Sequence, residues 1–197
     1  MDPEIENTAL LGDAATETGG TRAFFLDLVK FTILALVIVA PIRWFVAQPF
    51  IVNGASMDPT FRDGDYLIVD QLSYYFEEPA RGDVVIFKYP KDPSKYFIKR
   101  VIGLPQEKIH ITDGQVTITT AAKETIVLTE PYLVYEKSMN TQTGLGPNEY
   151  FVLGDNRPAS SDSRVWGPVP RKLITGSVFV RLYPFNQIGV RPGYVTE

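Results

Sequence analysis

Two stretches of sequence decide the fold: Asp83-Val84-Val85-Ile86-Phe87-Lys88-Tyr89 and Tyr96-Phe97-Ile98-Lys99-Arg100-Val101-Ile102. Both are rich in β-branched and aromatic residues, which is typical of strands. Turn signals separate further runs of the same kind, and Thr112-Asp113-Gly114-Gln115 fits a type I′ hairpin turn. The other predicted strands are residues 66–69, 108–111, 115–119, 149–153 and 176–182. The sequence therefore predicts a mainly β fold, closed or strongly coiled.

Composition excludes several classes of protein. The chain has 197 residues, enough for one moderate domain with a real core. Its 19 basic and 23 acidic residues give a net charge of −4, which argues against nucleic-acid binding. The absence of cysteine excludes disulfides, thiolate nucleophiles and cysteine-held metals. Since His110 is the single histidine, a two-histidine metalloprotease helix is impossible. We expect neither a metal nor a cofactor.

The N-terminal region combines an acidic tail with an apolar segment. Residues 1–22 hold one basic and five acidic residues without any period, which predicts a disordered tail. The uncharged run from Phe31 to Ile42 has only 12 residues, fewer than the roughly 20 that cross a bilayer, so a buried helix or a cleaved signal peptide are alternatives. No small-x-small cleavage site follows, and Trp44-Phe45 suits a membrane interface. We therefore predict one transmembrane helix over residues 23–46.

A serine stands among small and turn residues in Asn53-Gly54-Ala55-Ser56-Met57-Asp58-Pro59-Thr60. Small neighbours let a substrate backbone approach, although a serine in such a loop is most often only a turn residue. A serine becomes a nucleophile when a neighbouring base removes its proton. With one imidazole elsewhere in the chain, a lysine of lowered pKa is the other base that can work near neutral pH.

Lys99 is the candidate base. The alternation of its predicted strand places it on one face with Phe97 and Val101. An ammonium among apolar neighbours is costly to keep charged, which lowers its pKa. The alternative is an edge-strand lysine that prevents aggregation, and the local pattern alone does not exclude it.

Polar residues fill the later loop Gly154-Asp155-Asn156-Arg157-Pro158-Ala159-Ser160-Ser161-Asp162-Ser163-Arg164-Val165-Trp166-Gly167. Such a loop can satisfy its own backbone, pair Asp162 with Arg164 and present a hydroxyl to a neutral lysine. A plain Asx-turn connection uses the same residue types, so both interpretations stay open at this level.

Together these segments resemble the bacterial type I signal peptidases, membrane-bound serine proteases that remove signal peptides from exported preproteins. Four motifs occur in the family's order, downstream of an N-terminal apolar segment, and the resemblance covers residues from about 24 to 185. The matching residues are Gln48-Pro49-Phe50 with Gly54-Ala55-Ser56-Met57-Asp58-Pro59-Thr60, Arg81-Gly82-Asp83-Val84-Val85, Phe97-Ile98-Lys99-Arg100-Val101-Ile102-Gly103-Leu104-Pro105, and Gly154-Asp155-Asn156-Arg157 with Ser160, Asp162, Ser163, Arg164 and Gly167.

The resemblance implies a role for each matching residue. Ser56 would be the nucleophile and Lys99 the general base, with Ser160 the residue whose hydroxyl hydrogen-bonds the lysine. Asp162 and Arg164 would form a structural ion pair behind the site. The implied substrate-pocket residues are Val52, Met57, Phe97 and Ile98.

Two positions depart from the family pattern. Gly54 stands where some members have a serine that assists the oxyanion hole, so stabilisation would rest on the Ser56 N–H, with the Gly54 N–H as a second candidate donor. Leu104-Pro105-Gln106-Glu107 stands where many members have Leu-Pro-Gly-Asp. We expect this second change to alter a turn and leave the chemistry intact.

The resemblance implies a membrane-anchored serine endopeptidase that cleaves after Ala-x-Ala-like sites through an acyl-enzyme. A coiled antiparallel, barrel-like catalytic domain would comprise residues 47–105 and 149–197, with a smaller β insertion at 106–148. The implied partners are preprotein signal peptides and membrane lipid, and the implied location is the cell membrane, single-pass, with the catalytic domain on the extracytoplasmic face. Two alternatives remain: a Ser-Lys processing peptidase with one dedicated substrate, and a non-catalytic membrane-tethered β module for binding.

Overall fold

The computed structural model describes residues 18–41, 47–135 and 138–194. The chain divides into two units, Met1–Pro41 and Ile42–Glu197. In the first unit, helix α1 spans Thr18–Pro41, so the predicted N-terminal helix is present but begins five residues before position 23. Residues 18–22 of the predicted disordered tail belong to this helix. Residues 1–17 of the predicted tail and 42–46 of the predicted helix lie outside the described residues.

The apolar side chains of α1 are exposed from Phe24 to Val39. Within the described ranges, no helix is both long and apolar enough to cross a membrane. The transmembrane helix predicted over residues 23–46 is therefore not confirmed.

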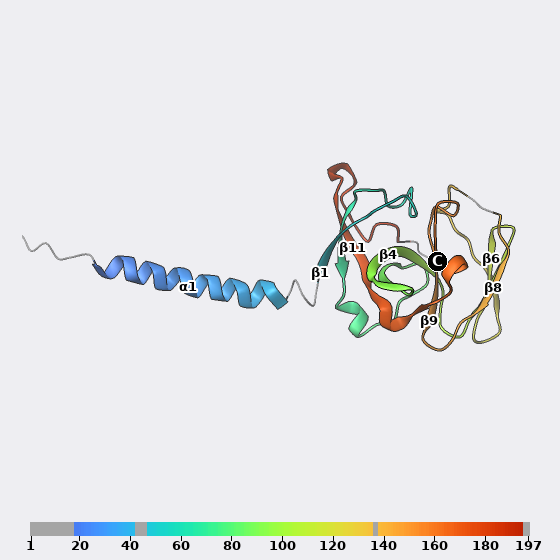
Figure 1. The fold of residues 1–197 in the computed structure, drawn as a ribbon, viewed down its shortest axis with the longest axis horizontal. Helices are drawn as coiled ribbons and strands as arrows, with labels where there is room; N and C mark the ends of the chain where they lie inside the picture. The colour runs from blue at the N-terminus through green and yellow to red at the C-terminus, as the bar shows by residue number, and fades with distance from the viewer. Residues whose placement is uncertain (1–17, 42–46, 136–137, 195–197) are drawn as a thin grey trace, which may run out of the picture. The chain divides into compact units, whose positions relative to one another are not determined.

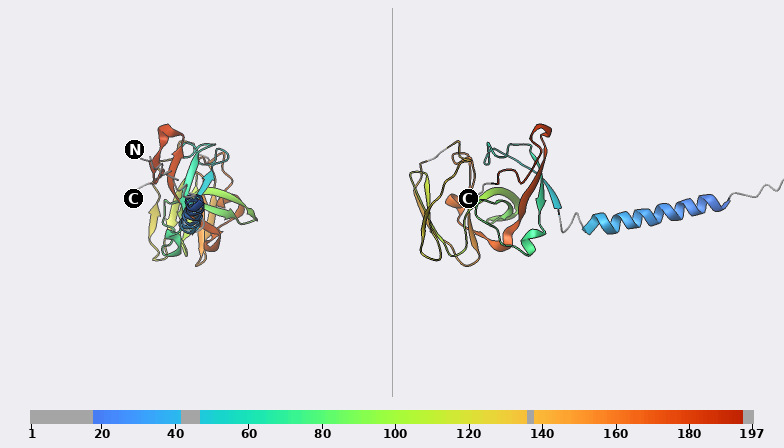
Figure 2. Two further views of the ribbon diagram at one scale, coloured as in Figure 1. Left: turned by 90° about the vertical axis from the view of Figure 1, so that its left-hand side faces the viewer. Right: turned by 180° about the vertical axis from the view of Figure 1, so that it is seen from behind.

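The second unit is mainly antiparallel β, as predicted. Its larger described sheet has the strand order β1-β2-β11-β3-β4-β9-β10, with β12 paired to β11, and its smaller described sheet has the order β7-β6-β5-β8. Figure 1 shows β6 and β8 of the smaller sheet beside β9, far from β1 at the opposite end of the larger sheet. Figure 2 shows the same arrangement from behind. The strands are β1 (Ala47–Ile51), β2 (Tyr66–Asp70), β3 (Val84–Tyr89), β4 (Asp92–Gly103), β5 (Lys108–Thr112), β6 (Gln115–Thr119), β7 (Thr125–Val127), β8 (Thr141–Gly144), β9 (Glu149–Leu153), β10 (Val169–Pro170), β11 (Ile174–Tyr183) and β12 (Gly189–Val190). The short helices are η2 (Ser73–Tyr75), α2 (Ser163–Trp166), η3 (Arg171–Leu173) and η4 (Phe185–Gln187).

Strands β3 and β4 are the two stretches that the sequence singled out. They pair antiparallel, with Val85 opposite Lys99. Because alternate side chains of a strand point to opposite faces, they contribute to two cores. Val85 and Val101 lie in one buried cluster, whereas Ile86 and Ile98 lie in another. Lys99 therefore belongs to a strand that is buried on both faces at this position.

The smaller sheet packs against one end of the larger sheet. Their shared core includes Ile102 and Phe151 from the larger sheet and Ile109 from β5. Gly103 allows this close approach, because a Cβ there would lie 2.6 Å from a terminal methyl carbon of Ile109. The smaller sheet falls within the predicted insertion, residues 106–148; the division into a catalytic domain and an insertion stays a prediction.

The hairpin between β5 and β6 confirms the predicted turn. Asp113 and Gly114 have φ of 50° and 87°, and a type I′ turn requires positive φ at both central residues. The single histidine, His110, lies on the exposed face of β5 in this smaller sheet.

Candidate active site

The fold brings Ser56 and Lys99 together although 43 positions separate them in the chain. Lys99 Nζ lies 2.6 Å from Ser56 Oγ and donates a second hydrogen bond of 2.8 Å to the Ile98 carbonyl. Lys99 lies on β4 and is 4% exposed. The base predicted from strand alternation thus contacts the serine predicted from loop composition.

The loop from Val52 to Asp65 holds Ser56 in place. Val52 and Asp65 close its base with a 2.9 Å backbone hydrogen bond. Met57, directly after the serine, is 0% exposed and packs in the core with Phe61. Met57 is not among the residues that line the cavity, so its prediction as a substrate-pocket residue is not confirmed. Its side chain packs in the cluster that also holds the lining residues Val52 and Ile98.

Burial determines the protonation of Lys99. Desolvation lowers its pKa from 10.5 to about 8, against the opposing influence of the Asp162 and Asp155 carboxylates. At pH 7 about one molecule in ten then carries a neutral amine, several hundred-fold more than for an ordinary lysine. The amine can therefore act as a base near neutral pH.

The backbone around Ser56 offers one donor for an oxyanion. The Gly54 N–H donates to Asp63 Oδ1 at 2.7 Å, so the candidate second oxyanion donor is already engaged. Gly54 has a φ of +89°, which glycine adopts without strain. In the described part of the chain, no acceptor takes the Ser56 N–H. Backbone stabilisation of an oxyanion would therefore come from the Ser56 N–H.

The loop after β9 clamps the Ser56 backbone. The Asn156 N–H donates to the Ser56 carbonyl at 3.0 Å. At Gly154 a Cβ would lie 2.4 Å from that same carbonyl oxygen and 2.2 Å from Ser160 Oγ. A side chain at position 154 would therefore displace either the nucleophile loop or Ser160.

Ser160 lies in this loop, but it does not form the predicted hydrogen bond to Lys99. Its Oγ is buried and, among the described residues, has no hydrogen-bond partner. The physical reason is that Lys99 Nζ is directed at Ser56 Oγ and the Ile98 carbonyl, while the Ser160 hydroxyl packs over Gly154.

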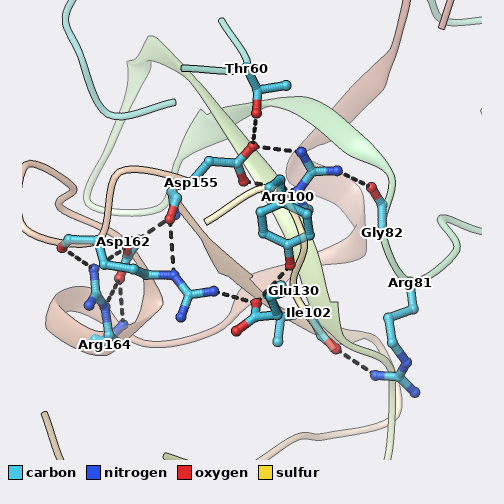
Figure 3. A network of polar contacts seen from close by, with 12 residues as sticks. Thr60, Arg81, Gly82, Arg100, Ile102, Glu130, Asp155, Asp162 and Arg164 are labelled. Atoms are coloured by element: carbon cyan, nitrogen blue, oxygen red, sulfur yellow. Dashed lines mark hydrogen bonds and ion pairs between the residues drawn. The ribbon is translucent and has the colours of Figure 1, made fainter. Parts of the chain in front are cut away.

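Buried ion pairs support the loop, two of them on Asp155 and Asp162 (Figure 3). The predicted pair of Asp162 with Arg164 has a separation of 2.7 Å, and Asp162 also accepts from the Gly154 N–H at 3.1 Å. The sequence reasoning missed the second pair, in which Arg100 contacts Asp155 at 2.6 Å while both side chains are at most 1% exposed. The available signal was the charge of Arg100 inside an otherwise apolar run, because a buried charge needs a partner.

A cavity of about 470 Å³ opens beside the serine and lysine. Of the predicted substrate-pocket residues, Val52, Phe97 and Ile98 line it. The sequence reasoning missed four further apolar lining residues: Phe50, Leu67, Ile86 and Tyr96. Of these, Ile86 lies directly opposite Ile98 in the pairing of β3 with β4. Along β4, residues 92–99 pair with β3 only, since the described pairing with β9 begins at Arg100. The cavity therefore lies beside an open strand edge.

No described group of three or more histidine, aspartate or glutamate side chains is arranged to hold a metal ion. The described site has the groups that acyl transfer needs. The Ser56 hydroxyl contacts the buried Lys99 amine, next to the free Ser56 N–H and an apolar cavity.

Comparison with known proteins gives one consistent family. A family model described as signal peptidase, peptidase S26, matches residues 25–183. The signal peptidase I of Leptolyngbya laminosa is 38% identical over 172 residues, covering 82% of this chain and 81% of that protein. A probable signal peptidase I-2 of Synechocystis sp. is 35% identical over 173 residues, covering 84% of this chain and 77% of that protein. A crystal structure of a signal peptidase I from Enterococcus faecalis V583 matches with a TM-score of 0.46 and 28% identity, over 52% of this chain and 97% of that one.

Proposed function

Because this chain belongs to the signal peptidase family, peptidase S26, we propose that Ser56 and Lys99 are the dyad with which it cleaves preproteins. The chain is a serine endopeptidase that removes signal peptides. The observation that carries the assignment of the dyad is the 2.6 Å separation between the serine hydroxyl and a lysine amine that is 4% exposed.

The reaction proceeds in two half-reactions. The neutral Lys99 amine accepts the Ser56 hydroxyl proton as Oγ attacks the scissile carbonyl carbon, and the Ser56 N–H donates to the developing oxyanion. The tetrahedral intermediate collapses to an acyl-enzyme, and the ammonium returns its proton to the leaving amine of the mature protein. Lys99 then deprotonates a water, which hydrolyses the ester and releases the signal peptide.

Substrate selection follows from the cavity and the strand edge. An extended preprotein pairs with the open edge of β4, and its first and third residues before the scissile bond point the same way, into the cavity. The apolar walls formed by Val52, Phe97 and Ile98 accept alanine and clash with larger side chains. These contacts support cleavage after Ala-x-Ala-like sites.

Ser160 contributes to the base in a later step. Its buried hydroxyl has no partner among the described residues and belongs to the loop that clamps Ser56. Once Ser56 is acylated, the Lys99 amine loses its hydrogen bond to the serine hydroxyl. Ser160 then holds the amine while it removes a proton from the attacking water, and the ion pair of Asp162 and Arg164 keeps the loop in place.

Helix α1 attaches the chain to the cell membrane as a single-pass anchor, with residues 47–105 and 149–197 as the catalytic domain on the extracytoplasmic face. Since no described helix meets the requirement for a span, this part rests on the exposed apolar surface of α1, which marks a site of interaction. The charges of Asp27 and Lys30 offset each other as an ion pair of 3.4 Å. Carbonate extraction of membranes tests the anchor, and release of the chain into the soluble fraction would contradict it.

The test of the dyad is cleavage of a preprotein with an Ala-x-Ala site by the full chain. Ser56→Ala and Lys99→Ala should each abolish processing, whereas Lys108→Ala, a change to an exposed lysine of β5, should leave it intact. Because the base must be neutral, the rate should rise about tenfold per pH unit below pH 8 and level off above it. Activity in Lys99→Ala, or a flat pH profile of the rate from pH 6 to 9, would reject lysine as the base.

A panel of preproteins separates the two alternative functions. No cleavage of any member would favour the non-catalytic binding module, and cleavage of a single member would favour a dedicated processing peptidase.

A further inference from the structure

The segment Glu130-Pro131-Tyr132 links the β insertion to the catalytic loop. It lies between β7 and β8, where a backbone hydrogen bond of 2.9 Å from the Leu128 N–H to the Val116 carbonyl fixes its start. The Glu130 side chain is only 5% exposed and accepts a 2.7 Å hydrogen bond from the Tyr132 hydroxyl. Burying a carboxylate costs free energy unless the charge is paired, so the burial of Glu130 needs a structural or functional reason.

Glu130 reaches the loop that clamps the nucleophile. It forms an ion pair with Arg157, whose side chain is 4% exposed. Arg157 Nε donates to the Gly154 carbonyl at 3.2 Å, and the Arg157 carbonyl accepts from Arg164 at 2.8 Å. The preceding residue, Asn156, donates its N–H to the Ser56 carbonyl at 3.0 Å. One ion pair therefore connects the insertion to the backbone of the serine.

Tyr132 reaches the residue next to the base. The Arg100 guanidinium carbon lies 3.9 Å from the centre of the Tyr132 ring, within the range of a strong cation–π contact. Arg100 follows Lys99 on β4 and binds Asp155, which in turn accepts from the Thr60 hydroxyl at 2.6 Å. Figure 3 shows Thr60, Asp155 and Arg100 meeting from three parts of the chain. The same short segment therefore contacts the residue next to the base and is linked to the serine through Arg157 and Asn156.

We propose that Glu130 and Tyr132, together the insertion latch, are positioning residues for the dyad, and that this is the role of the β insertion in catalysis. The proposal rests on the proposed function of Ser56 and Lys99. Its physical basis is that an arginine buried without its partner carries a large desolvation cost, so the loop around Arg157 rearranges when Glu130 is removed. Small displacements of catalytic groups reduce rates by up to about a hundredfold.

The test compares Glu130→Ala with Glu124→Ala, a change to an exposed glutamate of the same insertion. In Glu130→Ala we expect kcat for preprotein cleavage to fall about tenfold or more with KM within twofold, and Glu124→Ala should match the unmodified chain. Glu130→Gln keeps an acceptor for Arg157 and Tyr132 and should recover most of kcat. If Glu130→Ala does not fold, Glu130→Gln and Tyr132→Phe carry the comparison, each with a smaller loss of kcat.

A double-mutant cycle separates positioning from a general loss of stability. If Glu130 acts through Arg157, the loss of kcat in the double variant with Arg157→Ala should not exceed the larger of the two single losses. Losses that multiply, or an unchanged kcat in Glu130→Ala, would overturn the proposal.

A second readout does not depend on catalysis. Hydrogen exchange of the amides from Gly154 to Ser160 should accelerate in Glu130→Ala and not in Glu124→Ala. Unchanged exchange in Glu130→Ala overturns the latch even if the dyad is correct. The two proposals can also fail separately. If the unmodified chain cleaves no preprotein, the proposed function is rejected. Accelerated exchange in Glu130→Ala would then still support the latch as a structural link.

Discussion

Replacing Lys99 with methionine should remove a specific pH dependence from the stability of the protein. The amine has a pKa of about 8 in the folded chain and 10.5 when unperturbed. Because the folded pKa is depressed, the unfolded chain binds more protons between these values, and stability rises with pH across this window. The destabilisation is fully present below the folded pKa and vanishes above the unfolded one.

The magnitude follows from the size of the shift. Each pKa unit corresponds to about 1.4 kcal/mol, so burial of the charged amine destabilises the folded chain by about 3 kcal/mol at low pH. Between pH 7 and pH 10, the free energy of unfolding of the unmodified chain should therefore increase by about 2–3 kcal/mol relative to Lys99→Met. The comparison cancels other groups that titrate there, such as the buried tyrosines.

Urea denaturation at several pH values measures this difference. The matched control is Lys95→Met, because Lys95 is exposed and its removal should leave the pH dependence unchanged. The reasoning would be refuted if the free energies of unfolding of the unmodified chain and Lys99→Met differed by the same amount at every pH from 7 to 10. It would mean that the amine has an ordinary pKa in the folded chain, and the base assignment would lose its physical support.

Three further substitutions, one of them with a matched control, test the support of the site and one turn. Asp155→Ala should destabilise the chain by about 3–5 kcal/mol in urea denaturation, because it leaves the fully buried Arg100 unpaired; a loss below about 1 kcal/mol would contradict this. Gly154→Ala should reduce kcat about a hundredfold by displacing the nucleophile loop, whereas Gly189→Ala, whose new methyl meets no atom closer than 4.0 Å, should retain activity. Gln106→Gly should raise stability by about 1 kcal/mol because Gln106 has a φ of 67°, and a lowered melting temperature would show that this backbone is unstrained.

The local sequence pattern located most strands and offered Ser56 and Lys99 as candidates, while their roles came from the resemblance to the family. Alternation along β4 correctly placed Lys99 with Phe97 and Val101, because a strand's side chains alternate whatever the rest of the fold does. Short edge strands such as β1, β7 and β12 were missed, since a strand of a few residues is stabilised by its partner more than by its own composition. The latch residues Glu130 and Tyr132 gave no signal that local patterns could detect.

Several expected site details are not observed, because they depend on side-chain orientation and on the backbone geometry of the loops. Met57 was assigned to the pocket and lies in the core. The Gly54 N–H was a candidate oxyanion donor and is bound to Asp63. Ser160 was expected on the lysine and packs over Gly154. Each outcome is decided by rotamers and loop backbone angles, which neighbours distant in the chain select.

The sequence by itself determined the mainly β class, the motifs and the residue types able to perform acyl transfer, because these depend on local propensity and on side-chain chemistry. Only the tertiary structure decided that a hydroxyl and an amine 43 positions apart lie 2.6 Å from each other. The same packing excludes water from that amine and so lowers its pKa. Desolvation is a property of the assembled core, which no single segment of the chain contains.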